Sequence, residues 1–127
     1  DVYFNPENTE SVTLTPGSSD RLQTGLRFGV PHGYMLQVMN RSSVAAKRNL
    51  VVGAHVVDSG YDGEVFIDLH NIGDINQTIK PHTKIAQVVL IPVVSFRALE
   101  TSSGDLYNWY PITISDRGDG ALGSTGE

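Results

Sequence analysis

Short hydrophobic segments separated by turn-forming residues make up most of the chain, and few keep a helical spacing. Alternation of apolar and polar residues, or a run of apolar β-branched residues, favours strands over helices. The pattern predicts strands at 11–15, 23–30, 34–39, 50–57, 64–70 and 83–91. Strands at this spacing, bounded by Gly and Pro, indicate an all-β fold: a sandwich, a jelly roll or a barrel.

The predicted strands differ in how they should be buried. Within 64–70, Val65, Ile67 and Leu69 alternate with other residues, so these three side chains should share one face of the sheet. The segment 83–91 is nearly all apolar, as expected for a strand that is buried on both faces. The only helix that the pattern allows is short, at 43–47.

The composition changes towards the end of the chain. Residues after 100 are more polar and too numerous for a simple loop, which predicts an extended arm. We therefore divide the chain into a β domain, 1–100, and an arm, 101–127, for which a neighbouring subunit is a good candidate partner.

The end of the arm, 117–126, combines several glycines with Arg117, Ser124 and Thr125. Backbone N–H groups, two hydroxyls and a guanidinium together can wrap an anion such as a phosphate chain. A disordered Gly/Ser terminus fits the same composition.

Composition and charge exclude several classes of protein. The 127 residues suit one domain, and the mean hydropathy of −0.14 is ordinary. No apolar run reaches the length of about 18 residues that a membrane helix needs. A net charge of −5 argues against a general nucleic-acid or anionic-membrane binder. The absence of cysteine excludes a thiolate zinc site and fits a reducing compartment such as the cytoplasm or nucleus.

Arg41, Ser42 and Ser43 directly follow one predicted strand and precede the predicted helix. Ser43 can cap the helical turn, whose N–H groups would then receive an anion, with Arg41 and Lys47 supplying positive charge. An ordinary capped turn with a surface arginine is the simpler alternative.

The turn 58–63 connects two strong strands and brings Asp58 close to Tyr61. Because Asp58 follows two valines, we expect its carboxylate to be partly desolvated, which favours a role as general base towards a water molecule. Tyr61 can offer its flat face to a sugar or a base. The alternative is a turn aspartate that bonds its own backbone.

Two further polar residues lie within or beside apolar strands. Gln87 must find hydrogen-bond partners, either in the neighbouring backbone or in a ligand. His55 can assist acid–base chemistry, although packing or surface exposure explains it equally well. None of the four histidines has metal-ligand spacing, and no serine lies in a nucleophile elbow.

Taken in order along the chain, these motifs resemble those of the trimeric dUTPases, and the resemblance covers nearly all of the sequence. The matching segments are Thr24-Gly25-Leu26, Pro31-His32-Gly33-Tyr34, Arg41-Ser42-Ser43, Asp58-Ser59-Gly60-Tyr61-Asp62-Gly63-Glu64, Lys84-Ile85-Ala86-Gln87 and the arm from Arg117 to Gly126. Asp1-Val2 also resembles the end of the family's first motif, so a first strand is expected to precede it.

The resemblance implies a homotrimer of jelly-roll-like subunits with active sites at the subunit interfaces. The reaction that it implies is hydrolysis of dUTP to dUMP and pyrophosphate. Mg²⁺ would be held mainly by the triphosphate and water, and no nucleic acid or membrane would be a partner.

Family roles carry over to matching residues in this sequence. Asp58 would activate the attacking water, and Tyr61 would pack under the deoxyribose. The backbone of 52–57, which includes His55 and Val57, would read the uracil. The residues that contact the phosphates would be Arg41, Ser42, Ser43 and Gln87. The arm would close over the phosphates with Arg117, Leu122, Gly123 and Ser124. Asp1 would order a water molecule on the metal.

Three positions depart from the family pattern. Leu122 replaces the phenylalanine that covers uracil, His55 replaces a glycine, and 81–84 replaces a Lys-Gly-Asp-Arg turn. A non-catalytic trimer with a structural or regulatory role is therefore one alternative. A dCTP deaminase relative is another, because Asp68 occupies the place of that enzyme's catalytic glutamate.

Overall fold

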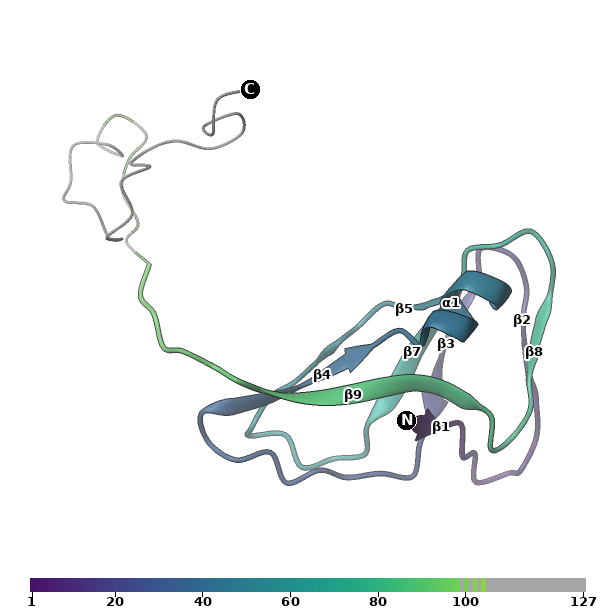
Figure 1. Cartoon of the computed structure of the whole chain (residues 1–127), viewed down its shortest axis with the longest axis horizontal. Helices are drawn as coiled ribbons and strands as arrows, with labels where there is room; N and C mark the ends of the chain where they lie inside the picture. The colour runs from purple at the N-terminus through teal and green to yellow at the C-terminus, as the bar shows by residue number, and fades with distance from the viewer. Residues whose placement is uncertain (99, 101, 103, 105–127) are drawn as a thin grey trace. The chain divides into compact units, whose positions relative to one another are not determined.

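A computed structural model describes residues 1–98, 100, 102 and 104 of the chain. The chain divides into two units, Asp1–Val94 and Ser95–Glu127. All secondary structure described below belongs to the first unit (Figure 1).

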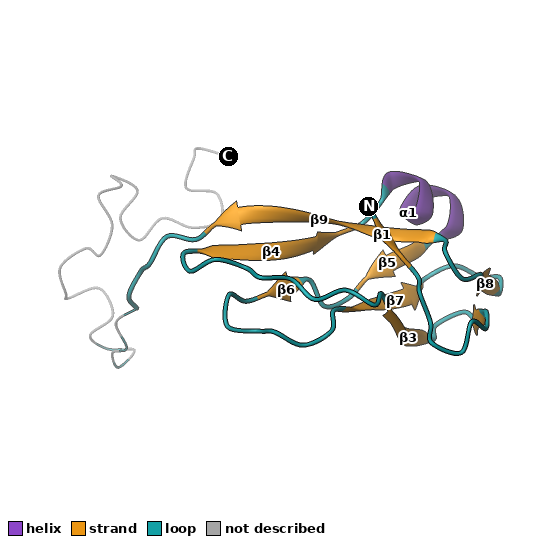
Figure 2. Ribbon diagram, turned by 90° about the horizontal axis from the view of Figure 1, so that it is seen from below, coloured by secondary structure: helices purple, strands orange, loops and turns teal. Residues whose placement is uncertain are grey.

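Strands dominate the first unit and form three sheets. The elements are β1 (Val2–Tyr3), β2 (Val12–Leu14), β3 (Ser19–Gln23), β4 (Tyr34–Met39), α1 (Ser42–Arg48), β5 (Leu50–Val52), β6 (Val56–Val57), β7 (Phe66–Asn71), β8 (Gln77–Ile79) and β9 (Lys84–Pro92). The sheet orders are β1-β9-β4-β6, β3-β7-β5 and β2-β8, and all pairs are antiparallel. Figure 2 shows β4 and β9 as one layer and β3, β5 and β7 in a second layer below it. This is the expected all-β, jelly-roll-like architecture.

The core fills the space between these layers. Val65, Ile67 and Leu69 are buried, as the alternation predicts, and Phe66 on the opposite face is exposed. Leu36, Val38 and Ala86 contribute from the other sheet, among other buried residues. Removal of each large apolar side chain from water contributes about 1.5–3 kcal/mol to folding.

The predicted helix at 43–47 is confirmed as α1, which packs Val44 into the core. It ends at Asn49, a left-handed residue with φ of 53° whose N–H donates to the Ala45 carbonyl. The prediction that Ser43 caps the helix is wrong. Arg41 holds the N-cap position without a side-chain cap hydrogen bond, and Ser43 already lies inside the first turn.

Two predicted strands are wrong in their extent. The segment predicted at 23–30 contains strand only at Gln23, because Gly25 is left-handed (φ 69°) and the Thr24 side chain bonds the backbone. The segment predicted at 50–57 is broken at 53–55. The reason is that β5 pairs with β7 whereas β6 pairs with β4, so residues 53–55 cross between two sheets.

The structure also contains three strands that the hydrophobic pattern does not predict: β1, β3 and β8. β1 and β8 are very short, and β3 carries exposed Ser19, Asp20 and Arg21 on three of its five residues. Each of these segments is a strand because it pairs with a neighbouring strand, and its own sequence does not alternate between apolar and polar residues over enough positions to predict it.

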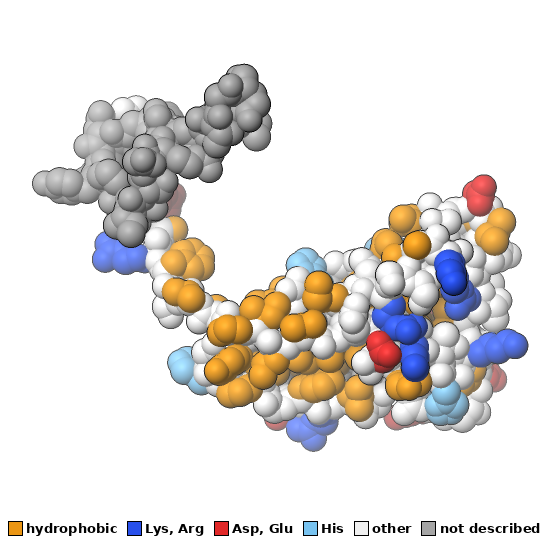
Figure 3. Space-filling model, viewed as in Figure 1, with side chains coloured by type: hydrophobic (Ala, Val, Ile, Leu, Met, Phe, Trp, Pro, Cys, Tyr) orange, Lys and Arg blue, Asp and Glu red, His pale blue; other side chains and the backbone are white. Residues whose placement is uncertain are grey.

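The strand predicted at 83–91 is confirmed as β9, but its expected burial on both faces is not seen in the single chain. Only Ile85 and Ala86 are buried, and Val89 and Leu90 remain 42% and 48% exposed. Figure 3 shows hydrophobic side chains gathered over β4 and this part of β9. The helix α1, with seven residues, is far too short to span a bilayer, and the described residues contain no other helix that could do so.

Candidate active site

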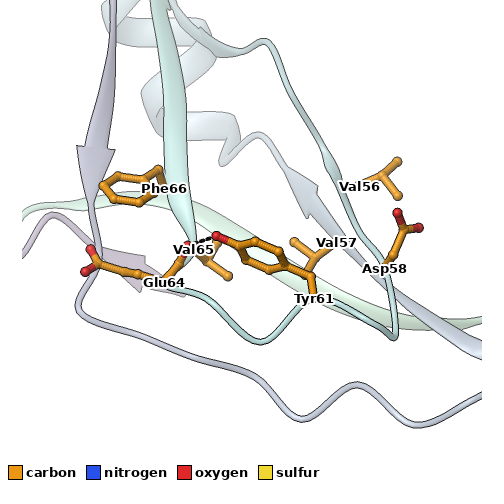
Figure 4. Close-up of a pocket in the computed structure, with 7 residues that line it drawn as sticks. All are labelled: Val56, Val57, Asp58, Tyr61, Glu64, Val65 and Phe66. Atoms are coloured by element: carbon orange, nitrogen blue, oxygen red, sulfur yellow. Dashed lines mark hydrogen bonds between the residues drawn. The ribbon is translucent and has the colours of Figure 1, made fainter.

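A cavity of about 270 Å³ opens beside the turn that follows β6. Its lining comes from β6, from the turn and from the start of β7. The lining residues are Val56, Val57, Asp58, Tyr61, Glu64, Val65 and Phe66 (Figure 4). The structure therefore brings Asp58 and Tyr61 together at one opening, as the turn between two strands predicts.

Tyr61 is held in place by its own turn, residues 58–65, which we call the Tyr61 turn. The Tyr61 N–H donates to the Asp58 carbonyl at 3.1 Å, and the hydroxyl donates to the Glu64 carbonyl at 2.6 Å (Figure 4). A Cβ on Gly63 would lie 2.7 Å from the Tyr61 hydroxyl oxygen, so a side chain there would displace the ring. The ring remains 46% exposed, which leaves a flat surface for a ligand.

The segment 24–27 anchors the Tyr61 turn to the sheet. The buried Thr24 hydroxyl donates to the Val65 carbonyl at 2.5 Å, and the Val65 N–H donates to the Leu26 carbonyl at 2.9 Å. Arg27 Nε donates to the Asp62 carbonyl at 2.6 Å. The Thr-Gly-Leu motif marks this segment in the sequence, but its role as a support is visible only in the structure.

The Asp58 carboxylate is exposed, so the expectation that it is partly desolvated is wrong for the single chain. The two preceding valines do not cover it because β6 ends at Val57 and the chain then turns into solvent. Water has free access to this carboxylate.

A second polar group, which we call the Asp1 cluster, consists of Asp1, Arg41 and Lys84. Arg41 Nε donates to Asp1 Oδ1 at 3.1 Å, and Lys84 Nζ lies 3.8 Å from Asp1 Oδ2. The Lys84 ammonium also lies 5.9 Å from the centroid of the Tyr3 ring. Figure 3 shows basic side chains gathered near α1 and the start of β9. The two cations thus converge on one carboxylate.

Gln87 and Asn40 fix the backbone that enters this cluster. Gln87 is half-buried, and its Nε2 donates to the Asn40 carbonyl at 2.8 Å. The Asn40 side chain in turn accepts from the Val52 N–H at 2.8 Å. The structure therefore confirms that Gln87 bonds a neighbouring backbone carbonyl, and its contact with a ligand stays a prediction. Arg41 follows Asn40 directly, and Ser42 and Ser43 lie exposed beside it.

Residues 53–55 run between the two sheets and interrupt the strand predicted at 50–57. The His55 carbonyl accepts from the Val38 N–H at 2.9 Å, and Val57 pairs with Leu36. His55 itself is exposed, and its Nδ1 lies 3.4 Å from the Gly53 carbonyl oxygen. The segment that the resemblance assigns to uracil therefore passes from one sheet to the other, and Val56 and Val57 at its end line the cavity.

The possible metal ligands near the site are few. The described residues contain no group of three or more His, Cys, Asp or Glu side chains arranged to hold an ion. Asp1 offers a single carboxylate, which Arg41 and Lys84 already contact, so its contact with a metal-bound water stays a prediction. The predicted arm contacts of Arg117, Leu122, Gly123 and Ser124 lie outside the described residues.

Comparison with known proteins decides the family. The dUTPase family model matches residues 4–126. This chain belongs to the dUTPase family. The deoxyuridine 5'-triphosphate nucleotidohydrolase of Chlamydia trachomatis is 33% identical over 120 residues, which is 93% of this chain and 78% of that protein. The enzyme of the same name from Roseobacter denitrificans is 38% identical over 117 residues, covering 91% and 72% respectively.

Solved dUTPase structures share the fold. A mutant dUTPase of Staphylococcus bacteriophage 80alpha, with dUpNHpp, matches with a TM-score of 0.75 and 22% identity over 100% of this chain and 87% of that chain. A mutant dUTPase from phage phi11 of S. aureus, described with a structural Mg(II) ion, matches with a TM-score of 0.65 and 21% identity over 84% and 86%. The jelly-roll-like sandwich of this chain is therefore that of its family.

Proposed function

We propose that this chain hydrolyses dUTP to dUMP and pyrophosphate. The observation that carries the proposal is the placement of Asp58 and Tyr61 in the lining of one open cavity, in a chain of the dUTPase family. Close relatives in sequence are named deoxyuridine 5'-triphosphate nucleotidohydrolases, which supports this activity.

In the proposed reaction, Asp58 orients a water molecule and accepts its proton as the water oxygen attacks the α-phosphorus of dUTP. The bond from the α-phosphorus to the oxygen that bridges it to the β-phosphorus breaks, and pyrophosphate leaves with that oxygen. Because the carboxylate is exposed at the cavity, it can be reached by water. Positioned general bases contribute about 10²–10⁴-fold to rate.

Tyr61 is proposed to pack under the deoxyribose and to leave no room for a ribose 2′-hydroxyl. Its fixed hydroxyl and its exposed ring face support this role, since a rigid ring discriminates between sugars better than a mobile one. The backbone of 52–57, with His55 and Val57, is proposed to read the uracil.

Arg41, Ser42, Ser43 and Gln87 are proposed to contact the phosphates, and Gln87 also holds the backbone before Arg41 through its Nε2. Phosphoryl transfer depends on positioning and charge neutralisation, which the Arg41 guanidinium can supply. Mg²⁺, when bound to the triphosphate, would neutralise further negative charge, with Asp1 contacting one of its waters. The arm, 101–127, is proposed to close over the ligand with Arg117, Leu122, Gly123 and Ser124.

We further propose that three chains assemble around shared sites. The apolar surface over β4 and β9 supports this assembly, because Met39 and Val89, which the register places on one face of the sheet, are each more than two-fifths exposed on one chain. Contiguous apolar surface of this kind is typical of a protein interface. Light scattering after size exclusion tests the assembly, and a monomer would contradict the shared sites.

The activity is tested by incubating the protein and Mg²⁺ separately with dUTP, dCTP and dTTP, and assaying pyrophosphate and ammonia. Pyrophosphate from dUTP alone is the expected result. Ammonia from dCTP would instead identify a deaminase, and no product from any nucleotide would identify a non-catalytic trimer.

A further inference from the structure

Three residues meet on the outer face of the β3-β7-β5 sheet, where β5 ends. On β7, His70 Nε2 lies 3.1 Å from Asp68 Oδ2. The N–H of Gly53, the residue after β5, donates to the Asp68 carbonyl at 2.8 Å. Val51 lies opposite His70 in the register, so residues 51 and 53 share the face that carries both polar side chains.

The ends of the Asp68 and His70 side chains occupy the space where a side chain on Gly53 would begin. A Cβ at this position would lie 2.5 Å from Asp68 Oδ2 and nearer still to His70 Nε2. The backbone does not impose glycine here, since the positive-φ glycines among the described residues are Gly17, Gly25 and Gly33. The Asp68–His70 pair therefore sits directly against the Gly53 backbone.

Gly53 begins the segment that leads to the cavity. Its carbonyl oxygen lies 3.4 Å from His55 Nδ1, and the His55 carbonyl is bonded to the Val38 N–H. The next residues, Val56 and Val57, line the cavity. Only Ala54 and His55 therefore separate Gly53 from the first residue of the cavity wall.

We propose that Asp68 and His70 are positioning residues that fix Gly53 and so set the selectivity of the 53–57 segment for the pyrimidine base. The inference rests on the proposed function, in which this segment reads uracil. Within the described part of the chain, neither side chain belongs to the cavity lining, so both act through Gly53 rather than on the substrate.

The neighbouring strand provides a matched control. In the register, β3 places Ser19 opposite His70 and Arg21 opposite Asp68, on the side of β7 away from β5. Ser19→Ala changes the same exposed face without touching Gly53. We expect this variant to keep the KM and selectivity of the unaltered protein within about twofold.

The test combines steady-state kinetics with a double-mutant cycle in the full chain. For His70→Ala and Asp68→Ala we expect the KM for dUTP to rise by about tenfold, with kcat changed far less, and the ratio of kcat/KM for dUTP over dCTP to fall. His70→Gln, which keeps a polar group near Asp68, should recover much of this loss. Gly53→Ala should raise the KM for dUTP more when it is made alone than in the Asp68→Ala/His70→Ala background, because the side-chain ends that its methyl group would displace are then absent.

The outcomes separate this inference from the proposed function. If the unaltered protein releases no pyrophosphate from dUTP, the proposed function fails. If it is active, but the Asp68 and His70 variants keep its KM and base selectivity, the positioning role is wrong. Equal damage by Gly53→Ala in both backgrounds, including failure to fold in both, also overturns it, whereas folding only in the double-alanine background supports it.

Discussion

The Tyr61 turn and the Asp1 cluster are built in different ways. The turn is held by hydrogen bonds that end on backbone atoms, from Tyr61 to Glu64 and from Thr24 to Val65. The cluster is held by ion pairs between partly exposed side chains, Asp1 with Arg41 and Lys84. Backbone-anchored groups keep their geometry when a ligand arrives, whereas exposed ion pairs exchange partners at little cost.

This difference matches what each region is proposed to do. Sugar discrimination and water activation need fixed geometry, which the turn supplies before substrate binds. Phosphate binding needs charges that can move from a protein carboxylate to a ligand anion, which the cluster supplies. Substitutions in the turn should therefore reduce turnover or fold stability, and substitutions in the cluster should change affinity and its salt dependence.

The largest effect is expected for Asp58→Asn. Turnover of dUTP should fall by about 10²-fold or more, because the amide cannot accept the proton of water. Nucleotide binding, measured by calorimetry, should be largely retained because the exposed side chain does not support the fold. Asp62→Asn, in the same turn and also exposed, is the matched control and should stay near the activity of the unaltered protein. Normal turnover by Asp58→Asn would show that Asp58 is not the general base.

Gly63→Ala should have the next largest effect. The new methyl group would approach the Tyr61 hydroxyl and displace the ring, so kcat/KM for dUTP should fall by on the order of tenfold. Discrimination between dUTP and UTP should fall as well. Gly60→Ala, at a glycine with open space around its Cβ, is the control. If both variants lose kcat/KM to the same extent, the absence of a side chain at Gly63 does not determine the position of the Tyr61 ring.

Thr24→Val tests the anchor of the turn. It leaves the buried Val65 carbonyl and the Leu26 N–H without the hydroxyl, which should lower the free energy of unfolding by about 1–3 kcal/mol. Denaturant titration measures this loss. Thr13→Val, at an exposed hydroxyl that bonds Thr78, should cost less. A larger loss at Thr13 would mean that the anchor is not where the structure places it.

The smallest effect is expected for Asp1→Asn, which frees Arg41 and Lys84 from their shared partner. Exposed ion pairs contribute about 0–1 kcal/mol, so thermal stability should barely change. The apparent affinity for inorganic pyrophosphate without Mg²⁺ should rise slightly, and more at low salt than at high salt. Unchanged affinity at every salt concentration would show that Asp1 does not compete for these cations.

The sequence predicted the parts of the fold that carry their own signal. Alternation in 64–70 correctly placed Val65, Ile67 and Leu69 in the core, and the one short helix that the pattern allowed, at 43–47, is α1. The sequence-based prediction failed where the pairing of distant strands determines which residues form a strand. The break at 53–55 arises because the chain changes sheets, and β3 exists because β7 lies beside it.

The candidate site was predictable in part for similar reasons. A short turn between two strands is enough to bring Asp58 and Tyr61 together, so local sequence suffices there. The pairing of Asp1 with Arg41, and the support of Gly53 by Asp68 and His70, join segments far apart in the chain. Their partners could not be identified without coordinates.

The proposed hydrolysis of dUTP with Asp58 as general base is tested most directly by measuring pyrophosphate release from dUTP by the unaltered protein and by Asp58→Asn, with Mg²⁺ present. We expect the unaltered protein to release pyrophosphate from dUTP and little or none from dCTP and dTTP. The variant should lose nearly all of this release while it still binds dUTP. Equal release by both proteins, or none by the unaltered protein, would contradict this proposal.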